Sequence, residues 1–121
     1  MSQALEDLGA HIRASMTNAV TGHAVSVGEL TLEVRTDDIA TVIKFLRDDP
    51  RCKFTTLIDI CGSDYPQRAK RFDVVYHLLS MQLNHRIRIK IQTDEDTPVA
   101  SIVGIFPCAD WFEREAFDMY G

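Results

Sequence analysis

Long hydrophobic runs are missing from this sequence, although 45% of its 121 residues are hydrophobic. No apolar stretch approaches the ~20 consecutive residues that a helix needs to cross a bilayer. Residues 1–16 include Glu6 and Asp7, and they have neither the apolar core of a signal peptide nor the arginine bias of a transit peptide. We therefore expect a soluble chain in a reducing, cytosolic compartment.

Cysteines are few, and they are scattered at positions 52, 61 and 108 without CxxC or CxxH spacing. Iron–sulfur clusters need several thiolates brought together, and close local spacing usually announces them. Free cysteine is among the residue types most often buried, so we expect Cys52, Cys61 and Cys108 to be structural. The sequence thus predicts no iron–sulfur cluster in this chain.

Motifs for other cofactors and for catalysis are absent as well. The four histidines, at positions 11, 23, 77 and 85, form no HxxxH or HxH pattern. His77 lies within an apolar stretch, which favours a core or interface imidazole over a metal ligand. No GxSxG turn, GxxxxGKS/T loop or GxGxxG turn occurs. We expect no catalytic, cofactor-binding or metal-binding residues.

An excess of positive charge is lacking too, because the formal net charge is −5. This balance argues against a general affinity for nucleic acid or anionic lipid. Arg86, Arg88 and Lys90 do form a basic stripe at alternate positions, but no exposed aromatics are interleaved with them. We interpret the stripe as a solvated or partner-facing strand face, which also discourages edge pairing.

What the sequence does contain is a succession of helix and strand patterns. Residues 1–17 repeat apolar side chains near the helical period and predict an N-terminal helix, followed by a linker at 18–23. Alternating residues predict a half-buried strand at 30–34. A helix follows, which Thr36 or Asp37 can cap and which must end before Pro50. Its apolar stripe is Ile39, Val42, Ile43 and Leu46.

Three more strands are predicted, at 54–60, 72–81 and 86–92. The first two are apolar on both faces, as in strands covered twice, and the third alternates so that Ile87, Ile89 and Ile91 face inward. A short helix at 99–105 and a closing helix complete the chain. This order predicts one α+β domain over residues 1–121, with a mixed, mainly antiparallel sheet of about four strands covered by helices.

The closing segment, residues 111–121, combines aromatic and charged side chains within about three helical turns. Asp110 can cap its start with Glu113 as in a capping box, and Arg114 can pair with Asp118 one turn later. One side carries the apolar stripe Phe112, Ala116, Met119 and Tyr120. Trp111 falls instead among the charged residues. A helix between one core and water does not need this tryptophan, so we expect a partner to contact it.

The run from Glu113 to Gly121, EREAFDMYG, resembles the signature of the thirty-kilodalton subunit, or C subunit, of bacterial respiratory complex I, the proton-translocating NADH:quinone oxidoreductase. Stretches at 57–66, 72–80, 86–90, 98–103 and 106–107 resemble the same family in the same order. The resemblance covers roughly residues 29 to 121. The family normally continues past this glycine with a His-, Pro- and Asp-containing extension. We therefore expect a fragment that lacks the family's C-terminal extension.

The resemblance implies a non-catalytic structural subunit of the hydrophilic arm. Its neighbours would be the forty-nine-kilodalton type of subunit (the D subunit), close to the quinone site, and the B subunit, which bears the terminal cluster. FMN, the iron–sulfur clusters and quinone would belong to other subunits. The assembly would couple NADH oxidation and quinone reduction to proton translocation. The protein would lie on the cytoplasmic side of the bacterial inner membrane, attached only through the complex and without nucleic acid.

We expect the partner interface on the closing helix and just beyond residues 54–60. The predicted contact residues are Trp111, Glu113, Arg114, Glu115, Asp118, Tyr120, Asp64 and Tyr65. Three alternatives stay open. The first alternative is a free-standing ligand-binding or regulatory α+β domain. The second is a related subunit of a membrane-bound hydrogenase. The third is a metal-dependent hydrolase, which requires the carboxyl groups of Asp59, Asp64 and Glu113 within ~5 Å of a common point.

Overall fold

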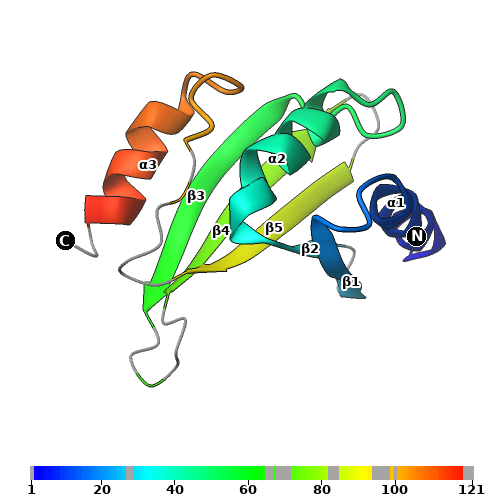
Figure 1. Ribbon diagram of the computed structural model, residues 1–121. Coiled ribbons are helices and arrows are strands. Elements are labelled where there is room, and N and C mark those ends of the chain that lie inside the picture. The colour runs from blue at the N-terminus through cyan, green and yellow to red at the C-terminus, as the bar shows by residue number, and fades with distance from the viewer. Residues whose placement is uncertain are drawn as a thin grey trace.

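The computed structural model describes residues 2–26, 29–64, 67, 72–81, 85–93, 99 and 101–118. Figure 1 shows helices placed along a long, twisted sheet. The elements in chain order are α1 (Ser2–Ser15), β1 (Val20–Ser26), β2 (Glu29–Val34), the 3-10 turn η1 (Thr36–Asp38), α2 (Ile39–Asp48), β3 (Thr56–Asp64), β4 (Phe72–Ser80), β5 (His85–Thr93) and α3 (Ala109–Asp118).

The five strands form one sheet in the order β1-β2-β5-β4-β3. Strands β1 and β2, β3 and β4, and β4 and β5 pair antiparallel, whereas β2 and β5 run parallel. The parallel pair places β5, the last strand in the chain, at the centre of the sheet. The predicted α+β class with a mixed, mainly antiparallel sheet is confirmed, with five strands in place of about four.

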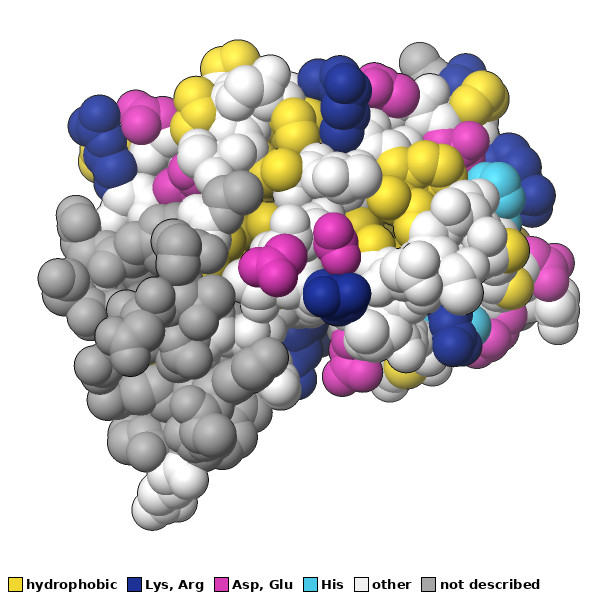
Figure 2. All heavy atoms as spheres, viewed as in Figure 1, with side chains coloured by type: hydrophobic (Ala, Val, Ile, Leu, Met, Phe, Trp, Pro, Cys, Tyr) yellow, Lys and Arg dark blue, Asp and Glu magenta, His cyan; other side chains and the backbone are white. Residues whose placement is uncertain are grey.

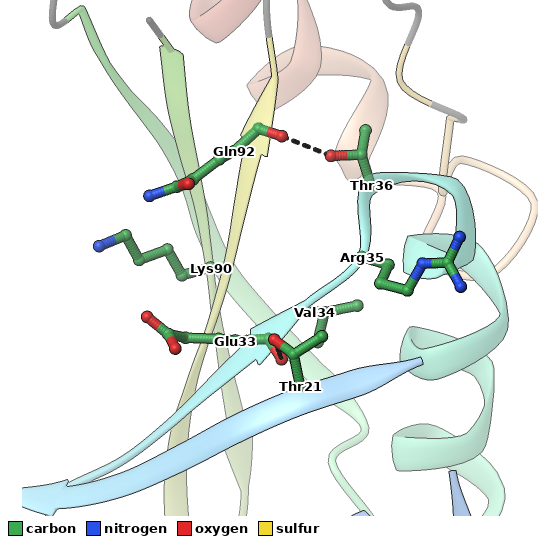
Figure 3. A pocket seen from close by; sticks show the side chains of 7 residues that line it. All are labelled: Thr21, Glu33, Val34, Arg35, Thr36, Lys90 and Gln92. Atoms are coloured by element: carbon green, nitrogen blue, oxygen red, sulfur yellow. Dashed lines mark hydrogen bonds between the residues drawn. The ribbon is translucent and has the colours of Figure 1, made fainter. Parts of the chain in front are cut away.

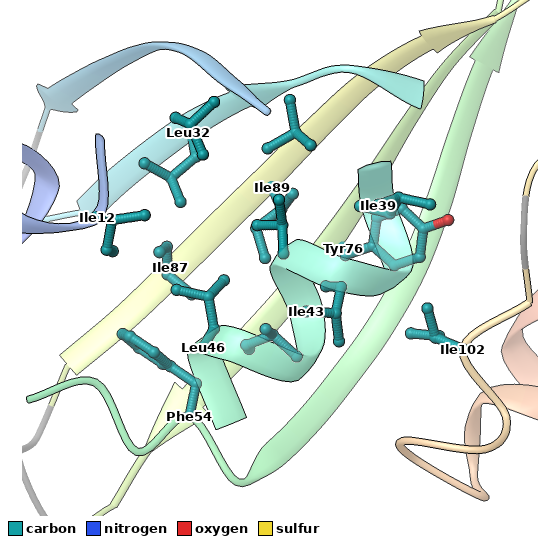
Figure 4. Close-up of a cluster of buried hydrophobic side chains, with 14 of the residues drawn as sticks. Ile12, Leu32, Ile39, Ile43, Leu46, Phe54, Tyr76, Ile87, Ile89 and Ile102 are labelled. Carbon is teal, nitrogen blue, oxygen red and sulfur yellow. The ribbon is translucent and has the colours of Figure 1, made fainter. Parts of the chain in front are cut away.

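Helix α2 crosses one face of this sheet (Figure 4). Its predicted stripe, Ile39, Val42, Ile43 and Leu46, is fully buried. The inward side chains of β5, Ile87, Ile89 and Ile91, are at most 1% exposed, as the alternation predicts. Burial of each such side chain stabilises the fold by about 1.5–3 kcal/mol. The helix stripe and the central strand therefore form the middle of the core.

Helix α1 packs on β1 and β2 at one end of the sheet (Figure 1). Its buried residues are Leu5, Leu8 and Ile12. At Gly9 the helix comes so close to β1 that an added Cβ would lie 2.5 Å from Cδ2 of His23. The absence of a side chain at Gly9 thus sets the distance between α1 and β1.

The predicted linker at residues 18–23 is wrong from residue 20 onward, because β1 begins at Val20. The sequence of β1, VTGHAVS, has the β-branched residues Val20, Thr21 and Val25, which favour a strand, but its glycine and poor alternation weaken the signal. Pairing with β2 and packing under α1 hold this segment as a strand.

The predicted helix at 99–105 is also wrong for the described residues: 103–105 form a turn, and 99, 101 and 102 have no regular secondary structure. The amides of Ile105 and Phe106 both donate to the carbonyl of Ile102, at 2.9 and 2.8 Å. The predicted cap of the α2 region is not formed either. The Thr36 hydroxyl donates to the carbonyl of Gln92 in β5, at 2.6 Å, and so ties η1 to the sheet.

Strand β3 lies at the sheet edge, and not between two covering layers as its apolar sequence predicts. The buried apolar residues of α1, α2 and α3 all belong to one hydrophobic core, the core that α2 forms with the sheet. We call the opposite side of the sheet the open face. On it Ile58 is 39% exposed, and Cys61 is exposed as well. Register places these side chains of β3, β4 and β5 on the open face: Asp59, Cys61, Val75, His77, Leu79, Arg86, Arg88 and Lys90.

Candidate functional site

Helix α3 brings Trp111 and Arg114 to the surface, as the sequence predicts. Trp111 is 65% exposed. Nη2 of Arg114 lies 3.3 Å from Oδ2 of Asp110, one turn earlier in the helix. Such an exposed pair contributes only ~0.3–0.5 kcal/mol. The arginine therefore remains available to a partner at little energetic cost.

The other predicted interface residues are described in part or not at all. Glu115 and Asp118 belong to α3, and Asp64 ends β3, but their side chains lie outside the described atoms. Tyr65 and Tyr120 lie outside the described residues altogether. The predicted contacts of all five stay predictions.

Glu113 turns inward from the same helix and is only 9% exposed. Its carboxylate accepts a hydrogen bond from Oγ of Ser101, at 2.7 Å, and another from the amide of Ile102, at 2.8 Å. The helix starts at Ala109 with Asp110 inside its first turn, so the predicted capping box is wrong. Glu113 instead clamps α3 to the turn segment that precedes it.

The phenol of Tyr76, on β4, lies close to this clamp. Tyr76 is fully buried, and its hydroxyl has no hydrogen-bond partner in the described part of the chain. Burial raises the pKa of Tyr76, and the charge of Glu113 raises it further. The phenol is therefore neutral at any physiological pH, and it belongs to the core shown in Figure 4.

A second set of polar groups lies on the open face. Asp59 and His77 are directly opposite each other in the β3–β4 pair, and Oδ1 of Asp59 lies 2.5 Å from Nδ1 of His77. Arg88 pairs with Glu29 of β2 at 3.3 Å. A hollow of about 370 Å³ lies beside them, lined in part by Ile58 and Arg86. In the predicted basic stripe, Arg88 thus pairs with Glu29, and Nζ of Lys90 lies 3.6 Å from Oδ2 of Asp73.

The hydrolase alternative needs Asp59, Asp64 and Glu113 at one point. The carboxylate of Asp59 bonds to His77 on the open face, whereas that of Glu113 bonds to Ser101 and Ile102 beside the core. No group of three potential metal ligands among the described side chains contains both Asp59 and Glu113. The described geometry gives this alternative no support.

The cysteines differ more than the sequence predicts. Cys52 is buried, but Cys61 and Cys108 are exposed. Burial, and then the charge of Asp59, raises the pKa of the Cys61 thiol. The expectation of three buried structural cysteines is therefore correct only for Cys52.

A third polar network joins α1 to the end of α2. Nη1 of Arg51 donates to Nδ1 of His11 at 3.3 Å, so Nε2–H of His11 donates to Asp49, at 2.8 Å. The thiol of Cys52 also donates to Asp49, at 3.2 Å. Burial works to raise the pKa of Asp49, but these hydrogen bonds outweigh it and leave the pKa lowered. The network fixes α1 against α2.

Two further hollows lack a convergent set of polar groups. In the first (Figure 3), Glu33 and Lys90 point to one side while Arg35 points away, toward α2. Figure 2 shows one face of the molecule, where apolar side chains reach the surface among charged ones, and the second hollow is likewise mainly apolar. Met16, Phe45 and Lys44 line it. Neither arrangement presents groups suited to a particular reaction.

The role of Glu113 and the pairing of Asp59 with His77 are the features that sequence reasoning missed. The position of Glu113 at the edge of an apolar helix face is a sequence signal that could have indicated burial. No comparable signal exists for Asp59 and His77, because their contact depends on the register of β3 and β4 and on a bulge between Leu57 and Asp59.

Comparison with known proteins identifies one family. The family described as "Respiratory-chain NADH dehydrogenase, 30 Kd subunit" matches residues 32–121. The chain is 64% identical over 121 residues to the C subunit of NADH-quinone oxidoreductase from Maricaulis maris, covering 100% of this chain and 60% of that protein. The corresponding subunit of Caulobacter vibrioides is 60% identical, covering 100% of this chain and 61% of that protein. The chain thus spans about 60% of the length of the curated relatives it matches.

A solved structure shares the fold. One protein of the membrane-bound sulfane sulfur reductase (MBS), an archaeal respiratory membrane complex, superposes with a TM-score of 0.75 and 21% sequence identity. The match covers 91% of this chain and 64% of that protein. At this identity the likeness concerns the fold alone.

Proposed function

Because the chain belongs to the family described as the 30 Kd subunit of respiratory-chain NADH dehydrogenase, we propose that it is a non-catalytic structural subunit of an NADH:quinone oxidoreductase. The family match confirms the resemblance seen in the sequence. In this proposal the protein belongs to the hydrophilic arm and packs against the forty-nine-kilodalton type of subunit, the D subunit, near the cluster-bearing B subunit. FMN, the iron–sulfur clusters and quinone are held by those and other subunits.

The observation that carries the proposal is the exposure of Trp111 and Arg114 on a helix that Glu113 fixes from the other side. Tryptophan and arginine are enriched among the few residues that supply most of the energy of protein interfaces. A rigid helix loses little conformational entropy when a partner covers it. Helix α3 therefore has the properties of a preformed contact surface.

The proposed role is to hold the geometry of a neighbour. By covering part of the D subunit, the protein keeps the walls of the quinone pocket in place during electron transfer. Membrane attachment occurs only through the complex, on the cytoplasmic side of the inner membrane. None of the described helices is long and apolar enough to cross a bilayer.

The test is co-purification from native membranes after mild detergent. A tagged protein carrying Trp111→Ala should retain the D subunit about 30-fold less than wild type, because a tryptophan that acts as a hot spot of an interface contributes about 2 kcal/mol or more. Arg114→Ala should have a smaller effect in the same direction. Arg13→Ala, an exposed change at the end of α1, is the matched control. Mass spectrometry measures recovery of the partner, and NADH:quinone activity should fall in parallel.

Unfolding curves of the isolated variants must match that of wild type, so that lost assembly reflects lost contact. Full recovery of the partner with both α3 variants would contradict the proposed surface. Recovery of the tagged protein alone, in wild type as well, would favour the free-standing ligand-binding domain instead.

A further inference from the structure

Two neighbouring strands place three different metal-ligand types on the open face. Asp59 and Cys61 lie two residues apart on β3, so their side chains emerge on the same face. His77 lies on β4 directly opposite Asp59 and diagonal to Cys61. One carboxylate oxygen, the thiol sulfur and one ring nitrogen all lie within 4.8 Å of one another.

We propose that Asp59, Cys61 and His77 bind a thiophilic divalent cation, with Zn²⁺ as the best fit. Zinc prefers thiolate, imidazole and carboxylate ligands at about 2.0–2.3 Å, in a tetrahedral arrangement. Ligand atoms around such an ion are therefore about 3.5 Å apart. The three ligand atoms lie within 4.8 Å of one another without a metal, so binding requires them to draw closer by about 1 Å.

The donor set distinguishes zinc from the common hard cations. Calcium and magnesium select oxygen ligands, usually several carboxylates and carbonyls. Here oxygen comes only from Asp59, whereas sulfur and nitrogen come from Cys61 and His77. Softer ligands of this kind select zinc among the abundant divalent ions. Three protein ligands leave a fourth position, which water can enter from the hollow beside His77 and Arg86.

Two of the three groups are already joined by a hydrogen bond in the metal-free arrangement. The carboxylate of Asp59 accepts the Nδ1 proton of His77, at 2.5 Å. On metal binding the thiol of Cys61 releases one proton to solvent. The hydrogen bond between Asp59 and Nδ1 of His77 breaks, and the Nδ1 proton exchanges through solvent to Nε2, so that Nδ1 is free to bind the metal. The divalent charge then balances the thiolate and the carboxylate. The nearby guanidinium of Arg88 opposes a cation, but Glu29 pairs with it at 3.3 Å and offsets its charge.

A similar trio elsewhere in the chain lacks these properties. His11, Asp49 and Cys52 also lie within 4.8 Å of one another, but Cys52 is fully buried. Arg51 donates to the free ring nitrogen of His11, and Asp49 already accepts hydrogen bonds from both neighbours. This trio is a structural network, and it serves as an internal comparison for the open-face site.

Cobalt(II) titration of the reduced protein tests the proposal, because a cobalt–thiolate bond gives a charge-transfer absorption that a carboxylate or imidazole alone does not. We expect one cobalt per molecule with this absorption, and its displacement by Zn²⁺. Cys61→Ser should abolish the absorption. Asp59→Asn and His77→Gln should weaken zinc binding at least about 10-fold in competition with a chelating dye. Cys108→Ser, which removes the other exposed thiol, is the matched control and should bind as wild type.

Zinc should also protect Cys61, and not Cys108, from alkylation in the wild-type protein, a measurement that needs no variant. The proposal is overturned if the charge-transfer absorption is absent, if it survives Cys61→Ser, or if it disappears with Cys108→Ser. Unchanged zinc affinity in Asp59→Asn and His77→Gln would overturn it as well. Circular dichroism of each variant confirms that the compared proteins are folded.

Discussion

Glu113 shows how one charged side chain can determine what its neighbours expose. Withdrawing a carboxylate from water is costly unless hydrogen bonds compensate for it. Here the hydroxyl of Ser101 and the amide of Ile102 supply that compensation. Because the bonded groups belong to the turn before α3, the helix cannot rotate about its axis without breaking them. This constraint keeps Trp111 directed away from the core.

Tyr76 presents the opposite case, a buried polar atom without compensation. Its hydroxyl has no hydrogen-bond partner within the described part of the chain. Tyr76→Phe removes that hydroxyl and keeps the ring, so we expect the free energy of unfolding to stay level or rise by up to about 1 kcal/mol. Urea denaturation measures the change. Ser101→Ala, which removes a hydrogen bond to Glu113, should instead lower the unfolding free energy by about 1 kcal/mol. A comparable loss in Tyr76→Phe would mean that the phenol is hydrogen-bonded after all.

At the scale of single elements, the docking of α1 depends on a missing side chain. Glycine within a helix usually costs about 0.5–1 kcal/mol relative to alanine, so Gly9→Ala should be favourable on propensity alone. The new methyl group, however, would lie 2.5 Å from the imidazole of His23, a residue of β1 that faces α1. We expect this overlap to outweigh the gain and to lower the unfolding free energy by about 1–3 kcal/mol.

Gly104→Ala is the matched control, because a Cβ at that position meets no atom within 4 Å. Gly104 lies in a turn, so thermal unfolding of the two variants separates the overlap at Gly9 from the general effect of Gly→Ala on the unfolded chain. Equal or raised stability of Gly9→Ala would show that α1 can shift away from β1 at no cost.

Elements also show what the sequence can and cannot predict. Alternation in β5 and the apolar stripe of α2 identified the inward side chains correctly. The face that a residue occupies follows from the side-chain repeat of its own strand or helix. The position of a strand within a sheet does not follow from its own sequence pattern, because it depends on which other strands pair with it. Strand β3 has the apolar sequence of a central strand, yet it lies at an edge because β5 pairs with β2. The cluster of Asp59, Cys61 and His77 was missed for the same reason, since it arises from pairing between strands.

For the whole molecule, the strand order predicts an uneven distribution of stability. Strand β5 is hydrogen-bonded on both sides, to β2 and β4, and its inward isoleucines are at most 1% exposed. Strand β1 is at an edge, and its second half alternates between exposed and half-buried residues. Native-state hydrogen exchange should therefore be slowest for the amides of β5, which open only on global unfolding, and faster for β1 through local opening. The free energy from the slowest β5 amides should equal that from urea denaturation. Exchange of β5 as fast as that of β1 would mean that the parallel β2–β5 pair, which joins the two parts of the sheet, opens independently of the rest.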